Sequence, residues 1–198
     1  MNEVWFRPLV WMDYRLALLL TVVLPLVLLI WAVFRRKEAM CKLAIIYWRV
    51  ASLLMITIYL LIPGWKIGLI TLFAARILIP ISLWFWVDLN EEIRDLPNSL
   101  LKLVFTSWRW ATTLYCLLGA IASAIFLPCG FSKAQMATDF CQVWLEAPQV
   151  YRQLIHPKPG NEGFLGFVGA VCLVIYVIYL AYFVLIRLGK QGRSALEQ

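Results

Sequence analysis

Histidine is almost missing from this sequence, which contains only His156. A b-type haem held by two histidines inside a membrane, or a chlorophyll ligated there by histidine, is therefore excluded. The sequence also contains no P-loop, no His-Glu-x-x-His and no Gly-x-Ser-x-Gly motif. Its five cysteines include no Cys-x-x-Cys spacing. We therefore expect no cofactor and no confident metal site, and an enzyme is disfavoured.

Long apolar stretches dominate the rest of the chain. Hydrophobic residues make up 63% of its 198 residues, whereas a soluble domain has roughly 45–50%. A helix needs about 20 apolar residues to span a lipid bilayer. The sequence therefore predicts an all-α bundle of five transmembrane helices within one domain, residues 1–198. The predicted spans are Leu16–Phe34, Leu43–Ile62, Ile67–Val87, Leu101–Leu127 and Phe164–Ile186.

The segments between the spans have their own expected structures. Residues 1–15 contain several aromatic side chains, so we expect an arm lying along the outer interface. A short cytoplasmic helix should follow the third span, and the outer loop 128–163 should hold an amphipathic helix that ends near Pro148. Four glycines enter the last span at every third residue and predict close helix packing: Gly160, Gly163, Gly166 and Gly169.

A proline inside a span leaves a backbone carbonyl without its usual donor. Pro25 lies inside the first span and cannot donate to the carbonyl of Thr21, which should bend the helix. Because lipid offers no hydrogen bonds, a neighbouring helix must supply a donor to that carbonyl.

The distribution of charge predicts the topology. The formal net charge is +7, but the basic residues lie at helix ends rather than in one patch, so nucleic acid is not an expected partner. The short loop after the first span is the most basic and should be cytoplasmic; it contains Arg35, Arg36, Lys37 and Lys42. This places the N-terminus in the lumen or periplasm and the C-terminus in the cytoplasm.

Arg76 is the charged residue nearest the middle of the third span. No Asp or Glu lies inside any predicted span, so we expect no carboxylate partner at its depth. A water-filled cavity, an anionic lipid or other ligand, or free backbone carbonyls remain as alternatives. Pro80 frees the carbonyl of Arg76 itself. We favour carbonyl bonding or snorkelling over ligand binding.

Two further arginines enter the spans from the cytoplasmic side. The segments 42–52 and 102–112 align without gaps, so that Trp48-Arg49 matches Trp108-Arg109. Internal duplication and chance similarity are both open. Arg49 and Arg109 are candidates for binding a lipid headgroup or for pairing with carboxylates.

An acidic run follows the third span. Asp88, Glu91, Glu92 and Asp95 share one helical face. We favour a solvated helix that begins at Asp88, with Glu91 completing a capping box, and whose acids pair with Arg49 and Arg109. A weak Mg²⁺ or Ca²⁺ site is the alternative.

Cys129 and Cys141 lie in the same outer loop, where oxidation is possible. They are either a disulfide that tethers the outer helix or two ordinary thiols.

Three stretches resemble a known family: Trp5-Phe6-Arg7-Pro8-Leu9, Asp13-Tyr14-Arg15-Leu16 and Trp86-Val87-Asp88-Leu89-Asn90-Glu91-Glu92. They look like an uncharacterised integral-membrane family of cyanobacteria, a domain of unknown function. The resemblance implies the plasma or thylakoid membrane of a photosynthetic bacterium and no particular activity.

The expected function is therefore non-catalytic. Ten tryptophans, eight tyrosines, the glycine-lined last span and the outer helix favour an accessory or assembly factor that docks on a larger photosynthetic membrane complex. A small transporter or channel that uses Arg76 is the first alternative. A lipid-modifying enzyme that uses the acids of Asp88–Asp95 is the second.

Overall fold

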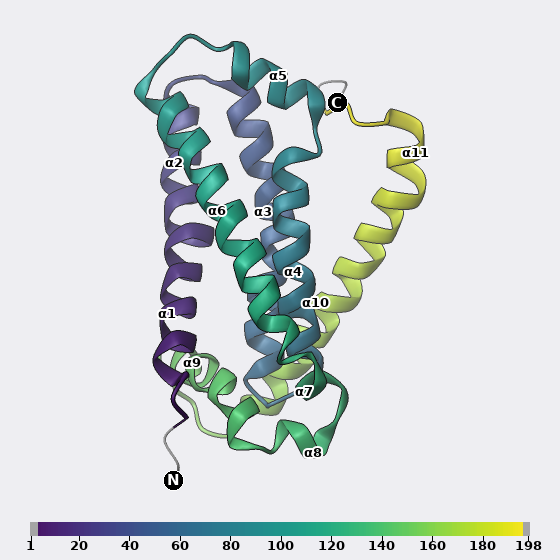
Figure 1. Ribbon diagram of the computed structural model, residues 1–198. Helices are drawn as coiled ribbons and strands as arrows, with labels where there is room; N and C mark the ends of the chain where they lie inside the picture. The colour runs from purple at the N-terminus through teal and green to yellow at the C-terminus, as the bar shows by residue number, and fades with distance from the viewer. Residues whose placement is uncertain (1–3, 196–198) are drawn as a thin grey trace.

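The computed structural model describes residues 4–195, and this part of the chain contains helices and no strand. Two long rods are continuous through short π-helical segments, α1–η1–α2 near the beginning and α10–η2–α11 at the end (Figure 1). The elements are α1 (Arg7–Ala17), η1 (Leu18–Val23), α2 (Leu24–Phe34), α3 (Glu38–Leu61), α4 (Ile67–Trp84), α5 (Val87–Asp95), α6 (Leu100–Ala124), α7 (Leu127–Phe131), α8 (Lys133–Met136), α9 (Asp139–Ile155), α10 (Glu162–Tyr182), η2 (Phe183–Arg187) and α11 (Leu188–Gln191).

The long helices indicate an integral membrane protein. Within the described residues, four helical stretches are long and apolar enough to span a bilayer: Arg7–Phe34, Glu38–Leu61, Ile67–Trp84 and Glu162–Arg187. The predicted all-helical class is confirmed. Helix α6 has 25 residues and lies alongside these stretches, but Lys102, Arg109 and several hydroxyl side chains make it less apolar, and it is not among the four. The fifth span therefore stays a prediction.

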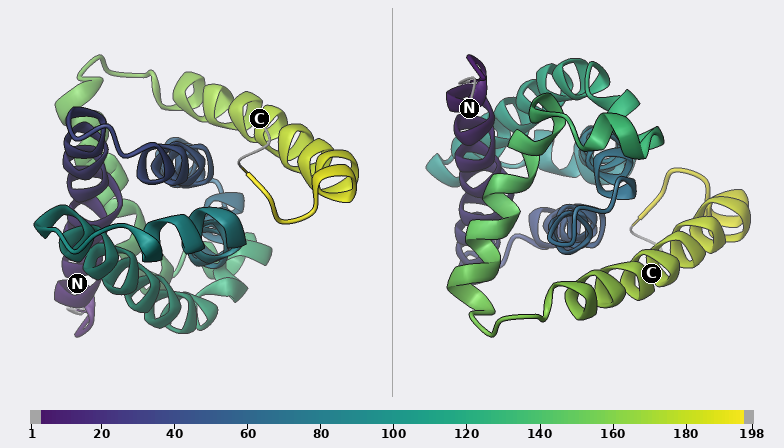
Figure 2. Two further views of the ribbon diagram at one scale, coloured as in Figure 1. Left: turned by 90° about the horizontal axis from the view of Figure 1, so that it is seen from above. Right: turned by 90° about the horizontal axis from the view of Figure 1, so that it is seen from below.

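The helices form a bundle with different structures at its two ends. The short helices α7 and α8, together with α9, cover one end, and α5 covers the other (Figure 1). The described chain starts at the α7–α9 end and finishes beside α5. Viewed along the bundle, α10 leaves the other long helices and runs outward from them (Figure 2).

The first helix begins earlier than the sequence predicts. It starts at Arg7 rather than Leu16, so the expected interfacial arm is wrong for residues 7–15. Pro8 suits the first turn of a helix. Two polar side chains of α1 bond to α9: Arg7 Nε and Trp11 Nε1 donate to Glu146 over 2.9 and 2.8 Å.

Tyrosine hydroxyls satisfy the carbonyls that two prolines leave free. The hydroxyl of Tyr47 in α3 donates to the carbonyl of Thr21 over 2.8 Å, four residues before Pro25. This confirms that a neighbouring helix supplies the required donor. The hydroxyl of Tyr14 donates in the same way to the carbonyl of Trp144 over 2.8 Å, four residues before Pro148. The prediction that the outer helix ends near Pro148 is wrong, because this bond lets α9 continue through the proline to Ile155.

The glycine pattern before and within α10 is only partly a packing surface. A Cβ on Gly166 would collide with Pro63, and one on Gly169 would press on Tyr59 and Leu60 of α3. By contrast, nothing lies within 4 Å of a Cβ built on Gly160 or Gly163. Close packing of α10 is therefore confined to a short stretch near the α7–α9 end.

We predict that Tyr47→Phe lowers the free energy of unfolding by about 1–2 kcal/mol, because the buried carbonyl of Thr21 loses its donor. Thermal unfolding in a mild detergent measures the change. The matched control is Tyr182→Phe, since Tyr182 is 54% exposed. Equal effects of the two substitutions would contradict this role of the Tyr47 hydroxyl.

Candidate functional site

Arg76 lies near the middle of α4 and is 3% exposed. Its guanidinium forms an ion pair with Asp13 of α1 and donates to the carbonyl of Gly119 in α6. The expectation of no carboxylate partner is therefore wrong. The sequence reasoning placed Asp13 in a surface arm, whereas the early start of α1 carries it into the bundle.

The rest of the Arg76 environment is also supplied by the protein. The hydroxyl of Tyr115 donates to the carboxylate of Asp13 over 3.0 Å. The rings of Tyr115 and Trp144 each lie 5.8 Å from the guanidinium carbon, within the range of cation–π attraction. A Cβ at Gly119 would overlap the guanidinium, so the arginine needs glycine there. These contacts make Arg76 a link between three helices and leave it little capacity for a ligand.

A cavity of about 220 Å³ adjoins this ion pair. Asp13, Arg76 and Tyr115 border it, and most of its other lining is apolar side chains from the first rod, α3 and α4. A water-filled cavity was one of the alternatives for Arg76, and this cavity is the space next to its guanidinium.

Arg109 is equally buried, at 3% exposed, but pairs with neutral groups. Its guanidinium donates to the carbonyl of Leu83 over 2.9 Å and to the side-chain oxygen of Asn90. It also lies 4.1 Å from the ring centre of Trp84. The predicted pairing of Arg109 with the acidic run is wrong, because the side chain turns inward to α4 and to the amide at the base of α5.

The acidic run of α5 does not form one site. The helix begins at Val87 with Trp86 as N-cap, so the predicted capping box is wrong. Asp88 instead accepts hydrogen bonds from the Ser194 hydroxyl and the Ala195 backbone, at 3.0 and 2.5 Å, and so fastens the C-terminal segment.

The other three acids, Glu91, Glu92 and Asp95, are exposed. The Oδ1 atom of Asp95 lies 3.6 Å from Nε of its neighbour Arg94, so the two side chains form an ion pair. Among the described residues, no group of three metal-binding side chains is close enough to hold an ion.

Arg49 differs from the other two arginines because it is exposed. Its guanidinium donates to the hydroxyl of Tyr179 in α10 over 3.4 Å, so the predicted pairing with the acids of α5 is wrong for Arg49 too. Arg49 lines a crevice of about 200 Å³ between α3, α4 and the diverging end of the α10–η2 rod. We call this space the lateral crevice.

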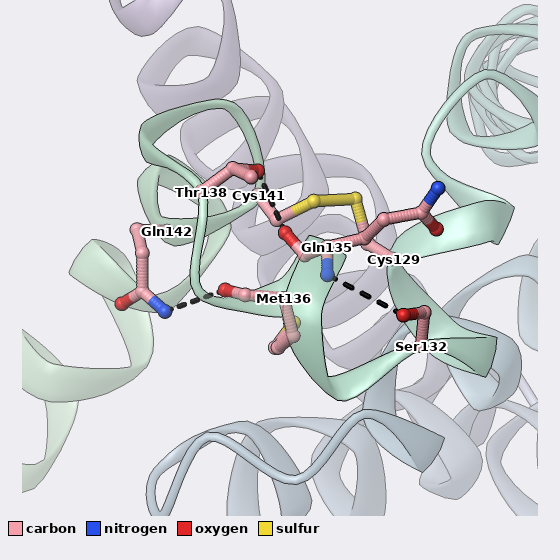
Figure 3. Close-up of a disulfide and its surroundings, with 7 residues drawn as sticks. All are labelled: Cys129, Ser132, Gln135, Met136, Thr138, Cys141 and Gln142. Carbon is pink, nitrogen blue, oxygen red and sulfur yellow. Dashed lines mark hydrogen bonds between the residues drawn. A yellow bond between two sulfur atoms is a disulfide. The ribbon is translucent and has the colours of Figure 1, made fainter.

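The α7–α9 end of the bundle is held together by a disulfide and a polar cluster. Cys129 of α7 and Cys141 of α9 are joined (Figure 3). Around them Ser132 caps α8 by accepting from the Gln135 backbone at 3.5 Å. The disulfide lies across the α7–α9 turn and tethers α9 to the end of α6.

The junction of α9 and α10 is bound to α3. The hydroxyl of Tyr59 in α3 lies 2.9 Å from Nε2 of His156, which follows α9. Arg152 of α9 forms an ion pair with Glu162 of α10, with 3.1 Å between Nη2 and Oε1. Burial and the neighbouring Tyr59 hydroxyl raise the pKa of Tyr151. The single histidine therefore takes part in a structural contact.

A family model described as a protein of unknown function, DUF3177, matches residues 7–196. The chain belongs to the DUF3177 family. This confirms the resemblance at the level of the family, while the cyanobacterial origin stays a prediction. No curated protein and no solved structure matches the chain.

Several residues that matter in the structure were missed by sequence reasoning. Asp13, Tyr14, Asn90 and Tyr115 each bond to a group far away in the chain. The only sequence signals for Asp13 are that a buried arginine in a membrane normally has an acidic partner, and that Asp13 lies just before the first predicted span.

We predict that Asp13 and Arg76 are energetically coupled. Replacing either side chain alone, in Arg76→Met or Asp13→Leu, should cost about 3–5 kcal/mol because it leaves a buried charge without its partner. The double variant should cost less than the sum of the two. Unfolding of the four proteins in detergent measures the coupling. The exposed pair Arg94 and Asp95 provides the control cycle, which should show little coupling. Additive effects at Asp13 and Arg76 would contradict the pair.

Thiol labelling tests the disulfide. Labelling of the denatured chain without reductant should modify Cys41, Cys116 and Cys172, and reduction should raise the number of labelled sites to five. Reduction should also lower stability by about 2–4 kcal/mol. Five labelled cysteines before reduction would show that Cys129 and Cys141 are free thiols.

Proposed function

We propose that this protein is a non-catalytic accessory or assembly factor that docks laterally on a larger membrane complex. The observation that carries the proposal is the position of the α10–η2 rod. Only 6% of its most apolar stretch is buried within the chain, compared with 56% for α4. Such an outlying helix offers a partner an apolar surface on both sides.

The rest of the molecule supports a docking role. The buried contacts of Arg76 and Arg109 are made by the protein's own groups, so they act as fixed links between helices. The outer end is fastened by the disulfide and by α9. A rigid bundle that presents one outlying helix is a suitable geometry for binding a neighbour with little rearrangement.

The orientation that we propose follows from charge and redox chemistry. The basic loop 34–42 lies at the α5 end, which we place in the cytoplasm. The disulfide lies at the opposite end, which we place in the lumen or periplasm because disulfides persist in oxidising compartments. Helix α6 then crosses as the fifth span, and the described chain starts and finishes on opposite sides. The family resemblance motivates the plasma or thylakoid membrane of a cyanobacterium, with a photosynthetic complex as partner.

A transporter or channel is the second candidate, and the cavity of about 220 Å³ beside Asp13 and Arg76 favours it. Flux of a solute in proteoliposomes, lost in Arg76→Leu, would support this candidate over docking. The third candidate, a lipid-modifying enzyme, has less support because Asp88 already accepts bonds from the C-terminal segment.

We predict that the protein migrates with a larger complex in native gels after extraction in mild detergent. A photo-crosslinking residue at Leu185 of the outlying rod, 78% exposed, should form an adduct with a partner. The same residue at Ile121 of α6, 69% exposed, is the matched control and should form much less. A chain that migrates alone, or equal adducts at both positions, would contradict docking through the rod.

A further inference from the structure

The lateral crevice lies in the half of the bundle nearer to α5. Its lining comes from the first half of α3, from the second half of α4 with the residues just after it, and from the end of the α10–η2 rod. Toward the α7–α9 end the crevice is closed, because Gly166 and Gly169 bring α10 against Pro63 and α3. Beyond this contact α10 leans away from α3 and α4 (Figures 1 and 2). The crevice therefore opens sideways, into the space that lipid fills around a membrane protein.

Two arginines line this crevice. Arg49 comes from α3, and Arg187 is the last residue of η2. None of the described acidic residues is part of the lining. The acid just beyond the end of α4, Asp88, accepts hydrogen bonds from the C-terminal segment. The rest of the wall is mainly apolar and includes Ile46, Leu78, Ile81, Leu180 and Val184.

The two arginine side chains lean toward each other along the crevice. Helix α3 begins at the α5 end, whereas the α10–η2 rod finishes there, so the two run in opposite directions (Figure 1). Side chains in a helix tilt toward the N-terminus of that helix. Arg49 therefore leans toward the α5 end, and Arg187 leans into the crevice. A third cation, Arg193, lies next to the same opening, with its guanidinium carbon 5.1 Å from the ring centre of Phe85.

Arg187 marks the mouth of the crevice, and Arg49 lies further in. Arg187 ends the apolar helical stretch Glu162–Arg187, which is where hydrocarbon gives way to lipid headgroups. Arg49 follows Leu43, the first residue of the predicted second span, by six residues, or about 9 Å of helix. Its long side chain leans back toward the mouth, as cationic side chains do when they extend to the headgroup layer. A phosphate that enters the mouth therefore meets Arg187 first and has Arg49 on its inner side.

We propose that the lateral crevice binds an anionic phospholipid, with its phosphate between Arg49 and Arg187 and an acyl chain along the apolar wall. An arginine presents its donors in a planar fork that suits two oxygens of one phosphate. An anion placed between two guanidinium groups also offsets the repulsion between them. Basic pockets between transmembrane helices are a recurrent form of binding site for anionic lipid headgroups.

The shape of the crevice favours a lipid over other anions. A soluble phosphate gains nothing from the apolar wall, whereas an acyl chain is stabilised by contact with it. The volume of about 200 Å³ is below the roughly 300–1,000 Å³ of a pocket that encloses a drug-sized ligand. Only part of a lipid therefore enters, and the rest stays in the bilayer. A helix of another protein, about 10–12 Å across, is too wide to enter unless α10 moves.

This lipid site is independent of the proposed docking function. The docking surface is the exposed side of the rod, represented by Leu185, which is not part of the crevice lining. A lipid in the crevice contacts the inner side of the rod and leaves Leu185 accessible.

The test measures lipid binding to the full-length protein in mild detergent by native mass spectrometry. Phosphatidylglycerol and phosphatidylcholine with identical acyl chains are compared, and the former should bind at least about tenfold more tightly. Arg49→Gln and Arg187→Gln should each weaken this preference, and the double variant should abolish it. The matched control combines Arg35→Gln with Arg94→Gln, two exposed arginines at the same end of the bundle. It removes the same charge and should keep the preference.

A second pair of variants tests the apolar wall. Val184→Trp places a large ring in the crevice without changing any charge and should weaken phosphatidylglycerol binding about tenfold. Leu185→Trp, on the same rod but outside the lining, is the control and should have little effect. Thermal unfolding confirms that each variant is folded. In the unsubstituted protein, phosphatidylglycerol with a photoreactive acyl chain should label residues of the crevice wall.

Several outcomes would overturn the proposal. These are equal binding of the two lipids, a preference that survives in the Arg49 and Arg187 double variant, and a preference that is lost equally in the Arg35 and Arg94 control. Displacement of the lipid by excess inorganic phosphate would assign the crevice to a soluble anion instead. Photolabelling confined to residues outside the crevice would also contradict the site. Failure of docking is distinguishable, because a protein that migrates alone in native gels would still prefer phosphatidylglycerol.

Discussion

The ion pair between Arg76 and Asp13 constrains the structure more than any other contact. A guanidinium buried in the middle of a membrane helix needs an opposite charge, and the chain provides it from its first helix. This requirement sets where α1 lies and how far it enters the bundle. It also requires a glycine at position 119, because α6 must approach close enough for its carbonyl to accept from Arg76. Buried ion pairs often add little net stability, and their best-attested contribution is to select one arrangement of helices.

Two tyrosines make comparable contacts between helices, but they satisfy backbone carbonyls rather than a charge. Lipid cannot donate to a carbonyl that proline has freed, so another element of the chain must supply the donor. Tyr47 of α3 donates to the carbonyl freed by Pro25, and Tyr14 of α1 donates to the carbonyl freed by Pro148. Because Tyr14 is next to Asp13, helix α9 and the buried ion pair depend on the same turn of α1. The disulfide adds a covalent link to this end, where hydrogen bonds are more open to water.

The sequence predicted the parts of this fold that depend on local pattern. Apolar length located the rods, Pro25 indicated a free carbonyl, and Cys129 and Cys141 could be proposed as a pair because they share one loop. It could not predict partners that are distant in the chain. Asp13 reads as a surface residue because hydropathy does not distinguish an acid in water from an acid neutralised by Arg76. The sequence predicted a helix end at Pro148 because the donor to the freed carbonyl of Trp144 is the hydroxyl of Tyr14, which is distant in the chain.

Arg49 and Arg109 show most clearly why the site could not be derived from sequence. Each follows a tryptophan, and the segments around them align, yet their environments are opposite. Arg109 turns inward, where Leu83, Asn90 and the ring of Trp84 surround it. Arg49 turns outward into the crevice, where a single tyrosine hydroxyl faces it. Arg76 and Arg109 thus each donate to acceptors on other helices of the same chain. Arg49 instead lies beside an apolar opening, on the side where α10 stands away from the bundle, so the difference between the two aligned segments comes from the helices that surround them and not from the segments themselves.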